Sequence, residues 1–209
     1  MSQMRLSRRE LLERCAVFGA LVTAPVADIA TVSAFWDQAE LKPTPPNALG
    51  PFYKKQAPDT RMLRTKGDAG MPLTVRGRVI DTRGETVPDA TVEIWHADHG
   101  GRYDLAGYRF RARLPVDKSA GYHFDTIMPG HYPDRVCQHV HYLVTAPGHK
   151  PLVTQLYFAT DPVFEGNPDT NFSKDPLVQS RELVRPVTIT GDPKAMYAAV
   201  SFELCLERR

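Results

Sequence analysis

Residues 138–144 read Gln-His-Val-His-Tyr-Leu-Val, a short run that we interpret as a β-strand. On a strand, residues two apart point to the same side. His139 and His141 are therefore expected to present two imidazoles to one face, while Val140 points to the other. Neutral imidazole is the commonest metal ligand among side chains. The run thus predicts a metal site on a sheet, although the pair alone does not identify the metal.

Short alternating segments surround this run and predict an all-β protein. Residues 72–80 and 90–97 alternate between apolar and polar side chains, with a turn signal at 81–84. Further strands are expected at 107–114, 121–127, 138–146, 151–158, 184–190 and 199–206. Short strands between turn signals, without long amphipathic helices, favour a β-sandwich of antiparallel strands with irregular loops. The polar loop at 167–180 is expected to hold a helical turn.

Length and composition fit one globular domain preceded by an arm. The chain has 209 residues, 42% of them hydrophobic and 24% charged, which suffices for a sizeable core. The net charge of +2 gives no basis for nucleic-acid binding. We assign residues 71–209 to the β-sandwich domain. Residues 35–70, rich in Pro, Lys and Gly, are assigned to an irregular N-terminal arm.

The first residues look like an export signal. Arg8 and Arg9 precede a weakly apolar run at 15–29, and residues 32–34 (Val-Ser-Ala) form a cleavage-site pattern. We therefore expect a twin-arginine signal over 1–34, a periplasmic or secreted protein, and no membrane contact once the signal is removed. The alternative is an ordinary amphipathic helix. Twin-arginine export moves folded proteins with their cofactors bound, which suits a metalloprotein.

Two cysteines, Cys137 and Cys205, follow that segment. An oxidising compartment would permit a disulfide between them. Sequence does not show whether the two side chains meet, so both states stay open, with free buried thiols as the preferred interpretation.

Two tyrosines lie in loops at predicted strand ends, where functional sites are commonly built. Tyr103 follows Gly-Gly-Arg at 100–102, and Tyr132 closes the run Met-Pro-Gly-His-Tyr at 128–132. For either tyrosine alone, the simpler interpretation is a half-buried aromatic whose hydroxyl bonds a backbone carbonyl. Three arginines alternate along 107–114, and we expect all three to face solvent: Arg109, Arg111 and Arg113.

Taken together, these motifs resemble the intradiol ring-cleavage dioxygenases, non-haem ferric enzymes that include protocatechuate 3,4-dioxygenase and catechol 1,2-dioxygenase. The specific part is the order Tyr103, Tyr132, His139 and His141, and the spacing from Trp95 to Tyr103 also agrees. Further matches extend the resemblance over roughly residues 49–160, and the early glycine and proline pieces among them are weak by themselves: Gly50-Pro51-Phe52-Tyr53, Val75-Arg76-Gly77-Arg78-Val79, Pro88-Asp89-Ala90, Ala146-Pro147-Gly148-His149 and Thr154-Gln155-Leu156.

The resemblance implies that Tyr103, Tyr132, His139 and His141 hold an Fe(III) ion. Hard phenolate oxygens suit a hard ferric cation, and a trivalent metal keeps a phenolate ionised. Tyr132 would leave as a catechol-type substrate binds and would take one of its protons. Both atoms of O2 would enter the ring between the two hydroxylated carbons to give a muconate-type dicarboxylate. Gln155 matches a family position beside the substrate.

One family feature is displaced in this chain. The family carries Arg-Pro-x directly before its His-x-His, whereas residues 136–138 here are Val-Cys-Gln and Arg135 lies one position too early. Either Arg135 reaches the site through a changed loop and stabilises negative charge on the substrate, or the site lacks that cation. The chain shows no counterpart of the helical dimerisation segment of the catechol branch, so the protocatechuate branch is the closer model. Because all four ligands are retained, we expect a homo-oligomer with a complete site in each subunit.

Two other hypotheses remain. The stretch 75–95 also occurs in carboxypeptidase-regulatory-like and transthyretin-like β-sandwich modules, which would make this a colourless, non-enzymatic binding protein. The second is a ferrous extradiol or cupin-type oxygenase that uses His139, His141 and a carboxylate such as Glu93.

Overall fold

The computed structural model describes residues 40–133, 135–192 and 195–209. These residues belong to one compact unit, Ala39–Arg209. The predicted signal at 1–34 and the first part of the predicted arm lie outside the described residues. Within the described part, no helix is long and apolar enough to cross a membrane.

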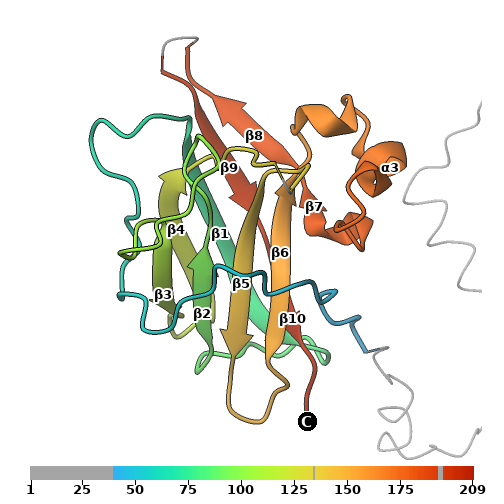
Figure 1. The fold of residues 1–209 in the computed structure, drawn as a ribbon. Helices are drawn as coiled ribbons and strands as arrows, with labels where there is room; N and C mark the ends of the chain where they lie inside the picture. The colour runs from blue at the N-terminus through green and yellow to red at the C-terminus, as the bar shows by residue number, and fades with distance from the viewer. Residues whose placement is uncertain (1–39, 134, 193–194) are drawn as a thin grey trace, which may run out of the picture. The chain divides into compact units, whose positions relative to one another are not determined.

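The strands of the described chain form two five-stranded sheets (Figure 1). The first sheet holds β1 (Pro72–Asp81), β4 (Gly121–Ile127), β8 (Val187–Thr190), β9 (Tyr197–Ser201) and β10 (Leu204–Leu206). The second sheet, in the order β3-β2-β5-β6-β7, holds β2 (Thr91–Trp95), β3 (Arg111–Pro115), β5 (His139–Thr145), β6 (Leu152–Phe158) and β7 (Val184–Arg185). The predicted β-sandwich is confirmed. Both sheets are mixed, because β1 pairs in parallel with β9 and β10, and β6 with β7.

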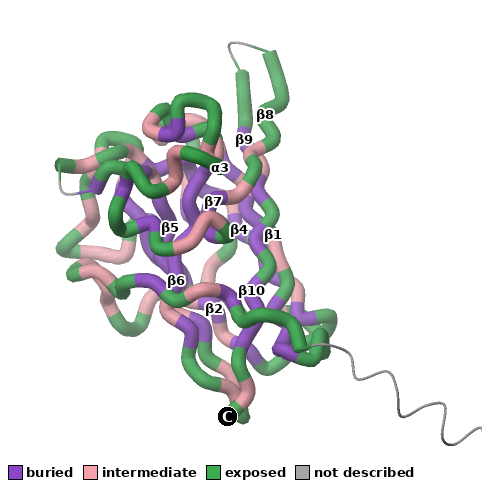
Figure 2. The backbone as a smooth tube through the Cα atoms, turned by 90° about the vertical axis from the view of Figure 1, so that its right-hand side faces the viewer, coloured by how far each residue is buried: buried purple, intermediate pink, exposed green. Residues whose placement is uncertain are grey.

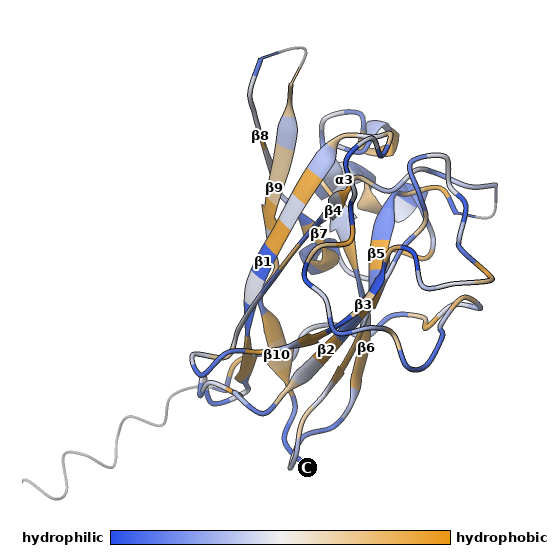
Figure 3. Ribbon diagram, turned by 90° about the vertical axis from the view of Figure 1, so that its left-hand side faces the viewer, coloured by the Kyte–Doolittle hydropathy of each residue, from blue (hydrophilic) through white to orange (hydrophobic). Residues whose placement is uncertain are grey.

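The core lies between the inner faces of the two sheets and follows from the period-two alternation. Apolar and polar residues alternate along β1 in Figure 3, and the strands of both sheets carry most of the buried positions in Figure 2. Tyr142 on β5 is fully buried and contacts Tyr122 and Phe202, edge to face. Burial of a large apolar side chain stabilises the fold by about 1.5–3 kcal/mol.

Two predicted strands are divided in the structure. The predicted strand 184–190 breaks at Pro186, which has no N–H to donate; β7 pairs with β6 in the second sheet, and β8 pairs with β9 in the first. The predicted strand 199–206 breaks after Ser201, where the Phe202 N–H donates to the carbonyl oxygen of Arg76. Both β9 and β10 then pair with β1, at different positions along it.

The predicted strand 107–114 begins later than expected. Residues 107–110 form a loop held by the Asp104 carboxylate, which accepts the N–H groups of Ala106, Gly107 and Arg109. A carboxylate that satisfies backbone donors in this way competes with strand pairing. The loop at 167–180 holds the predicted helical turn, α3 (Pro168–Asn171). It is flanked by 3₁₀ turns at Pro162–Phe164, Phe172–Lys174 and Arg181–Leu183.

The chain from residue 44 to residue 58 crosses the outer face of the second sheet (Figure 1). The segment starts at the edge of β6, where Asn47 N–H donates to Val153 O and the Thr154 hydroxyl donates to Pro45 O. On the outer face, the Gln155 amide donates to Ala48 O and the Arg111 guanidinium donates to Phe52 O. Further along, the Arg113 N–H donates to Pro58 O. This segment therefore covers β3, β5 and β6 on the side opposite the core, and side chains there are shielded from water.

Cys137 and Cys205 are both buried and free. The preferred interpretation of two unpaired thiols is confirmed.

Candidate metal centre

Tyr103, Tyr132, His139 and His141 come together on the outer face of the second sheet. The Tyr132 hydroxyl lies 3.3 Å from His139 Nε2. The ring centres of His139 and His141 are 4.8 Å apart, those of Tyr103 and Tyr132 5.7 Å, and those of Tyr103 and His141 6.4 Å. The structure thus brings all four predicted ligands into one cluster, with the two imidazoles on one strand face as the alternation predicts.

His139 is held neutral with one nitrogen directed at the cluster. Its Nδ1 lies 2.8 Å from the Cys137 carbonyl oxygen. A carbonyl only accepts hydrogen bonds, so Nδ1 carries the proton and Nε2 keeps its lone pair. Burial, reinforced by the Arg135 guanidinium, lowers the pKa of His139 to about 3. A neutral imidazole whose Nε2 lone pair points toward the cluster is the form that binds a metal.

His141 is fixed from two sides. The Trp95 indole stacks on its imidazole at 5.0 Å with 2° between the planes. On another side lies Gly50, where an added Cβ would stand only 2.9 Å from His141 Cε1. Burial, together with the neighbouring His139, keeps the pKa of His141 well below its usual value. Gly50 also has a φ of +73°, a conformation that favours glycine.

The two tyrosine-bearing loops meet at glycines. A Cβ on Gly101 would lie 1.9 Å from the His131 carbonyl oxygen, and one on Gly130 would lie 2.7 Å from Gly101 N. Any other residue at either position would separate the loops. This close packing of backbones is what places Tyr103 beside Tyr132, although 29 positions separate them in the chain.

The donor atoms of the cluster fit a ferric ion. Tyr103 Oη and both ring nitrogens of His141 are buried and have no hydrogen-bond partner among the described residues. An unsatisfied buried polar group costs about 1–3 kcal/mol, and a bound cation would remove that cost. Two phenol oxygens and two imidazole nitrogens are a donor set that hard, highly charged iron accepts. Burial, followed by the neighbouring Tyr132, raises the pKa of Tyr103, so ionisation of this phenol requires such a cation.

The hypothesis of a ferrous site built on a carboxylate is not supported. No group of three or more His, Cys, Asp or Glu side chains suited to a metal occurs in the described parts of the chain. Glu93, the carboxylate considered for that role, accepts a hydrogen bond of 2.7 Å from the Tyr53 hydroxyl. A metal at the histidine pair would therefore depend on the tyrosines.

Arg135 does reach the cluster. Its backbone N–H donates to Tyr132 O, closing a tight turn, and its buried Nη2 donates to Gln155 Oε1 at 2.8 Å and to Tyr157 Oη at 2.9 Å. Arg135 therefore lies beside Gln155 and Tyr157 of β6, although its position in the sequence is one residue earlier than in the family pattern. Tyr157 was missed by the sequence reasoning, although it lies two residues after Gln155 and pairs directly with His139.

Arg111 was expected to face solvent, and this expectation was wrong. Arg111, Trp95, His141 and Gln155 pair in succession across β3, β2, β5 and β6, and so form one row on the outer face. The segment that crosses this face covers Arg111, which is only 3% exposed. The other two arginines of that pattern are exposed, as expected: Arg109 and Arg113.

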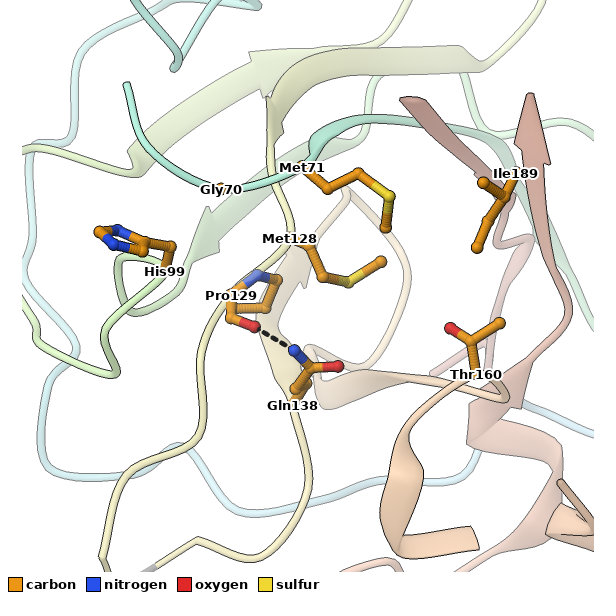
Figure 4. A pocket seen from close by; sticks show the side chains of 8 residues that line it. All are labelled: Gly70, Met71, His99, Met128, Pro129, Gln138, Thr160 and Ile189. Atoms are coloured by element: carbon orange, nitrogen blue, oxygen red, sulfur yellow. Dashed lines mark hydrogen bonds between the residues drawn. The ribbon is translucent and has the colours of Figure 1, made fainter. Parts of the chain in front are cut away.

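A separate cavity of about 390 Å³ lies beside Gln138, the residue that precedes His139 (Figure 4). It is lined by Met71, Met128, Thr160 and Ile189, with the Gln138 amide bonded to Pro129 O at 2.7 Å. None of the four candidate ligands lines it. The cavity is therefore distinct from the metal centre.

The fold and the cluster define a class: a β-sandwich with two tyrosines and two histidines on the outer face of one sheet. A family model described as "Dioxygenase" matches residues 48–208. The chain belongs to the intradiol ring-cleavage dioxygenase family. Because the match covers nearly the whole described domain, the hypothesis of a carboxypeptidase-regulatory-like module is not supported.

Individual relatives agree with this assignment. The chain is 30% identical over 190 residues to hydroxyquinol 1,2-dioxygenase of Corynebacterium glutamicum, covering 78% of this chain and 63% of that protein. It is 29% identical to catechol 1,2-dioxygenase of Acinetobacter baylyi, covering 79% and 62%. The chain thus spans less than two thirds of the length of these curated relatives. The closer likeness to the protocatechuate branch stays a prediction.

Solved structures share the fold. The dioxygenase domain of a dioxygenase carbohydrate-binding protein fusion from Streptomyces sp. SirexAA-E superposes with a TM-score of 0.68 at 31% identity, covering 80% of this chain and 100% of that one. Catechol 1,2-dioxygenase from Acinetobacter sp. ADP1 gives a TM-score of 0.67 at 27% identity, covering 79% and 63%.

Proposed function

We propose that this protein is an oxidoreductase that cleaves a catechol-type diol with O2 between its two hydroxylated carbons, giving a muconate-type dicarboxylate. The observation that carries the proposal is the convergence of Tyr103, Tyr132, His139 and His141, in which the buried Tyr103 hydroxyl and His141 imidazole find no hydrogen-bond partner within the described part of the chain. Membership of the intradiol family and relatives named hydroxyquinol and catechol 1,2-dioxygenase support it.

Fe(III) is the proposed metal, held by those four side chains. When bound, a ferric ion would supply the chemistry that makes an aromatic diol reactive toward molecular oxygen. His139 and His141 contribute as neutral imidazoles, since burial keeps both unprotonated at neutral pH. Tyr103 contributes the firmly held phenol oxygen, because Phe52 stacks on its ring at 4.2 Å with 17° between the planes.

Tyr132 is the proposed base for the incoming diol. It contacts Phe52 only edge-on, at 6.3 Å, and it lies on the irregular loop that precedes β5. Its hydroxyl lies 3.3 Å from His139 Nε2, so a movement of Tyr132 exchanges this contact for one to the incoming diol. With ferric ion bound, Tyr132 would be held as a phenolate. Its oxygen could then move away as the diol enters and accept a substrate proton at Oη, returning to the neutral phenol and leaving the diol as an anion.

Arg135 and Gln155 are the proposed substrate-side residues. Gln155 is fixed by its own amide, which donates to Ala48 O at 2.6 Å, and its Oε1 in turn orients the Arg135 guanidinium. Arg135 Nε is buried without a hydrogen-bond partner among the described residues. A spare N–H on a buried cation can bind the negative charge that develops on the substrate oxygens.

Oxygen uptake by the iron-loaded protein tests this proposal. Catechol, hydroxyquinol and protocatechuate are supplied in turn with ¹⁸O2, and the product is analysed by mass spectrometry. We expect a ring-opened dicarboxylate that carries both labelled atoms. His141→Gln should abolish uptake, whereas His123→Gln, at an exposed position on β4, should leave it unchanged. A semialdehyde product, or no uptake with any diol, would overturn the proposal.

We also propose export through the twin-arginine signal at 1–34, on the basis of the sequence pattern. The mature chain is expected to begin at Phe35 in the periplasmic fraction, as read by N-terminal sequencing. Replacing Arg8 and Arg9 together by lysine should retain the protein in the cytoplasm. Periplasmic protein from that double variant would contradict the proposal.

A homo-oligomer with a complete site in each subunit is proposed as well. Light scattering on the purified protein should give a multiple of the mass of one chain, with one metal per chain. A monomeric mass would contradict it.

A further inference from the structure

Arg111 is a buried cation without an anionic partner. It makes no ion pair with any carboxylate of the described chain. Its Nη1 donates to Phe52 O and its Nη2 to Asp104 O, while its Nε has no hydrogen-bond partner among the described residues. Burying a guanidinium without a carboxylate costs free energy that an apolar side chain of similar size would not cost. A residue retained at such a cost is a candidate for a role beyond packing.

The two carbonyl groups that Arg111 binds belong to the two segments that fix Tyr103. Phe52 provides the ring that stacks on the Tyr103 phenol at 4.2 Å, and Asp104 is the next residue after Tyr103 in the chain. The guanidinium carbon itself lies 5.8 Å from the centre of the Tyr103 ring, within the range of a cation–π contact. One side chain thus joins the backbone beside Tyr103, the ring stacked on it, and the phenol ring.

Arg113 supplies a natural comparison on the same strand. It lies two residues further along β3, on the same face, and forms an exposed pair with Asp59 at 3.4 Å. Such an exposed pair contributes about 0–1 kcal/mol. The difference between the two arginines is that only Arg111 touches the surroundings of a candidate ligand.

We propose that Arg111 is a positioning residue for Tyr103, an inference that rests on the proposed function. By holding the Phe52 and Asp104 carbonyl groups together, it fixes the direction of the Tyr103 oxygen toward the metal. The planar guanidinium presents several donors in a rigid arrangement and so serves two carbonyl groups at once. A lysine keeps the charge but offers a single ammonium on a flexible chain, so it cannot reproduce both contacts.

The test uses Arg111→Lys and Arg111→Met, with Arg113→Met as the control. Metal-free protein is titrated with ferric ion, and the dissociation constant and the visible tyrosinate absorption are recorded. Both Arg111 variants are expected to bind iron roughly 10–100-fold more weakly, as is typical when a group that orients a ligand is removed. Their absorption maximum should also shift, since the Tyr103–iron geometry changes. Arg113→Met should match the wild type in both measurements.

The possible results separate the explanations. Wild-type iron affinity and absorption in Arg111→Lys would show that charge alone matters, which overturns the positioning role. Unfolding of both Arg111 variants, seen by circular dichroism, would overturn it too, because the residue would then serve the fold. If the wild type binds iron and both variants match it, this inference alone fails. If the wild type takes up no ferric ion, the proposed function fails and this inference with it.

Discussion

Replacing Gly50 by alanine should disturb His141 directly. Gly50 has a φ of +73°, a conformation that costs a residue with a Cβ about 1–2 kcal/mol. The new Cβ would also lie 2.9 Å from His141 Cε1 and 3.4 Å from Nε2. Because Trp95 stacks on the imidazole, the ring is confined and its Nε2 must move relative to the other three ligands.

Gly148 provides a matched control. Its φ is +72°, nearly the same, but nothing lies within 4 Å of an added Cβ. Gly148→Ala should lose about 1–2 kcal/mol of unfolding free energy in urea denaturation of the metal-free protein, and Gly50→Ala at least as much, because its Cβ also meets the His141 ring. For a domain of this size that corresponds to roughly 2–8 °C in Tm.

Iron affinity should separate the two variants. Gly50→Ala is expected to bind ferric ion about tenfold or more weakly than the wild type, because one ligand is displaced. Gly148→Ala should bind it with wild-type affinity. Equal iron affinity in the two variants would refute the reasoning that places His141 in the metal centre with Gly50 behind it.

Three further predictions concern single side chains. Tyr132→Phe should lose part of the visible absorption and most of its turnover, because a ligand and a base for the diol are removed. Full colour with full turnover in this variant would show that Tyr132 is neither the ligand nor the base. Arg135→Met should lower kcat/KM by roughly 10–100-fold, equivalent to a charged hydrogen bond of about 1.5–3 kcal/mol, in steady-state oxygen uptake; an unchanged kcat/KM would remove Arg135 from the substrate side. Burial lowers the pKa of His96 to about 4, against 6.5 in the unfolded chain. Below pH 6.5 the unfolded state therefore binds a proton that the folded state excludes, and stability falls by up to about 3 kcal/mol as the pH drops toward 4. Denaturant titrations of metal-free protein should show a shallower fall for His96→Gln than for the wild type, and parallel curves would contradict the assignment.

The sheet positions of the candidate centre follow from local sequence. Alternation along 138–144 is enough to place His139 and His141 on one face, since a strand has no other arrangement for residues two apart. The positions of Tyr103 and Tyr132 do not follow from local sequence in this way. Their approach depends on backbone contacts at Gly101 and Gly130, which no periodicity encodes. Only the resemblance to a family with Tyr, Tyr and His-x-His in this order indicated them.

The misjudged arginine shows where alternation alone is insufficient. The pattern along 107–114 correctly alternates Arg111 with apolar residues, but it does not reveal that a distant segment covers the outer face. Arg135 poses the same difficulty, because its hydrogen bond to Gln155 joins a loop to a strand 20 positions further along the chain. Long-range coverage and loop geometry are tertiary properties. The division of the predicted strand 184–190, by contrast, could have been predicted from the sequence, because Pro186 has no N–H for strand pairing.

The most direct test of the central claim is a ferric titration of the metal-free protein followed by absorption spectroscopy. The account predicts one iron per chain and a red-brown tyrosinate band that saturates at that ratio. The band should be reduced when either Tyr103 or Tyr132 is replaced by phenylalanine. A protein that stays colourless at saturating iron, or that keeps its full band without both tyrosines, would contradict it.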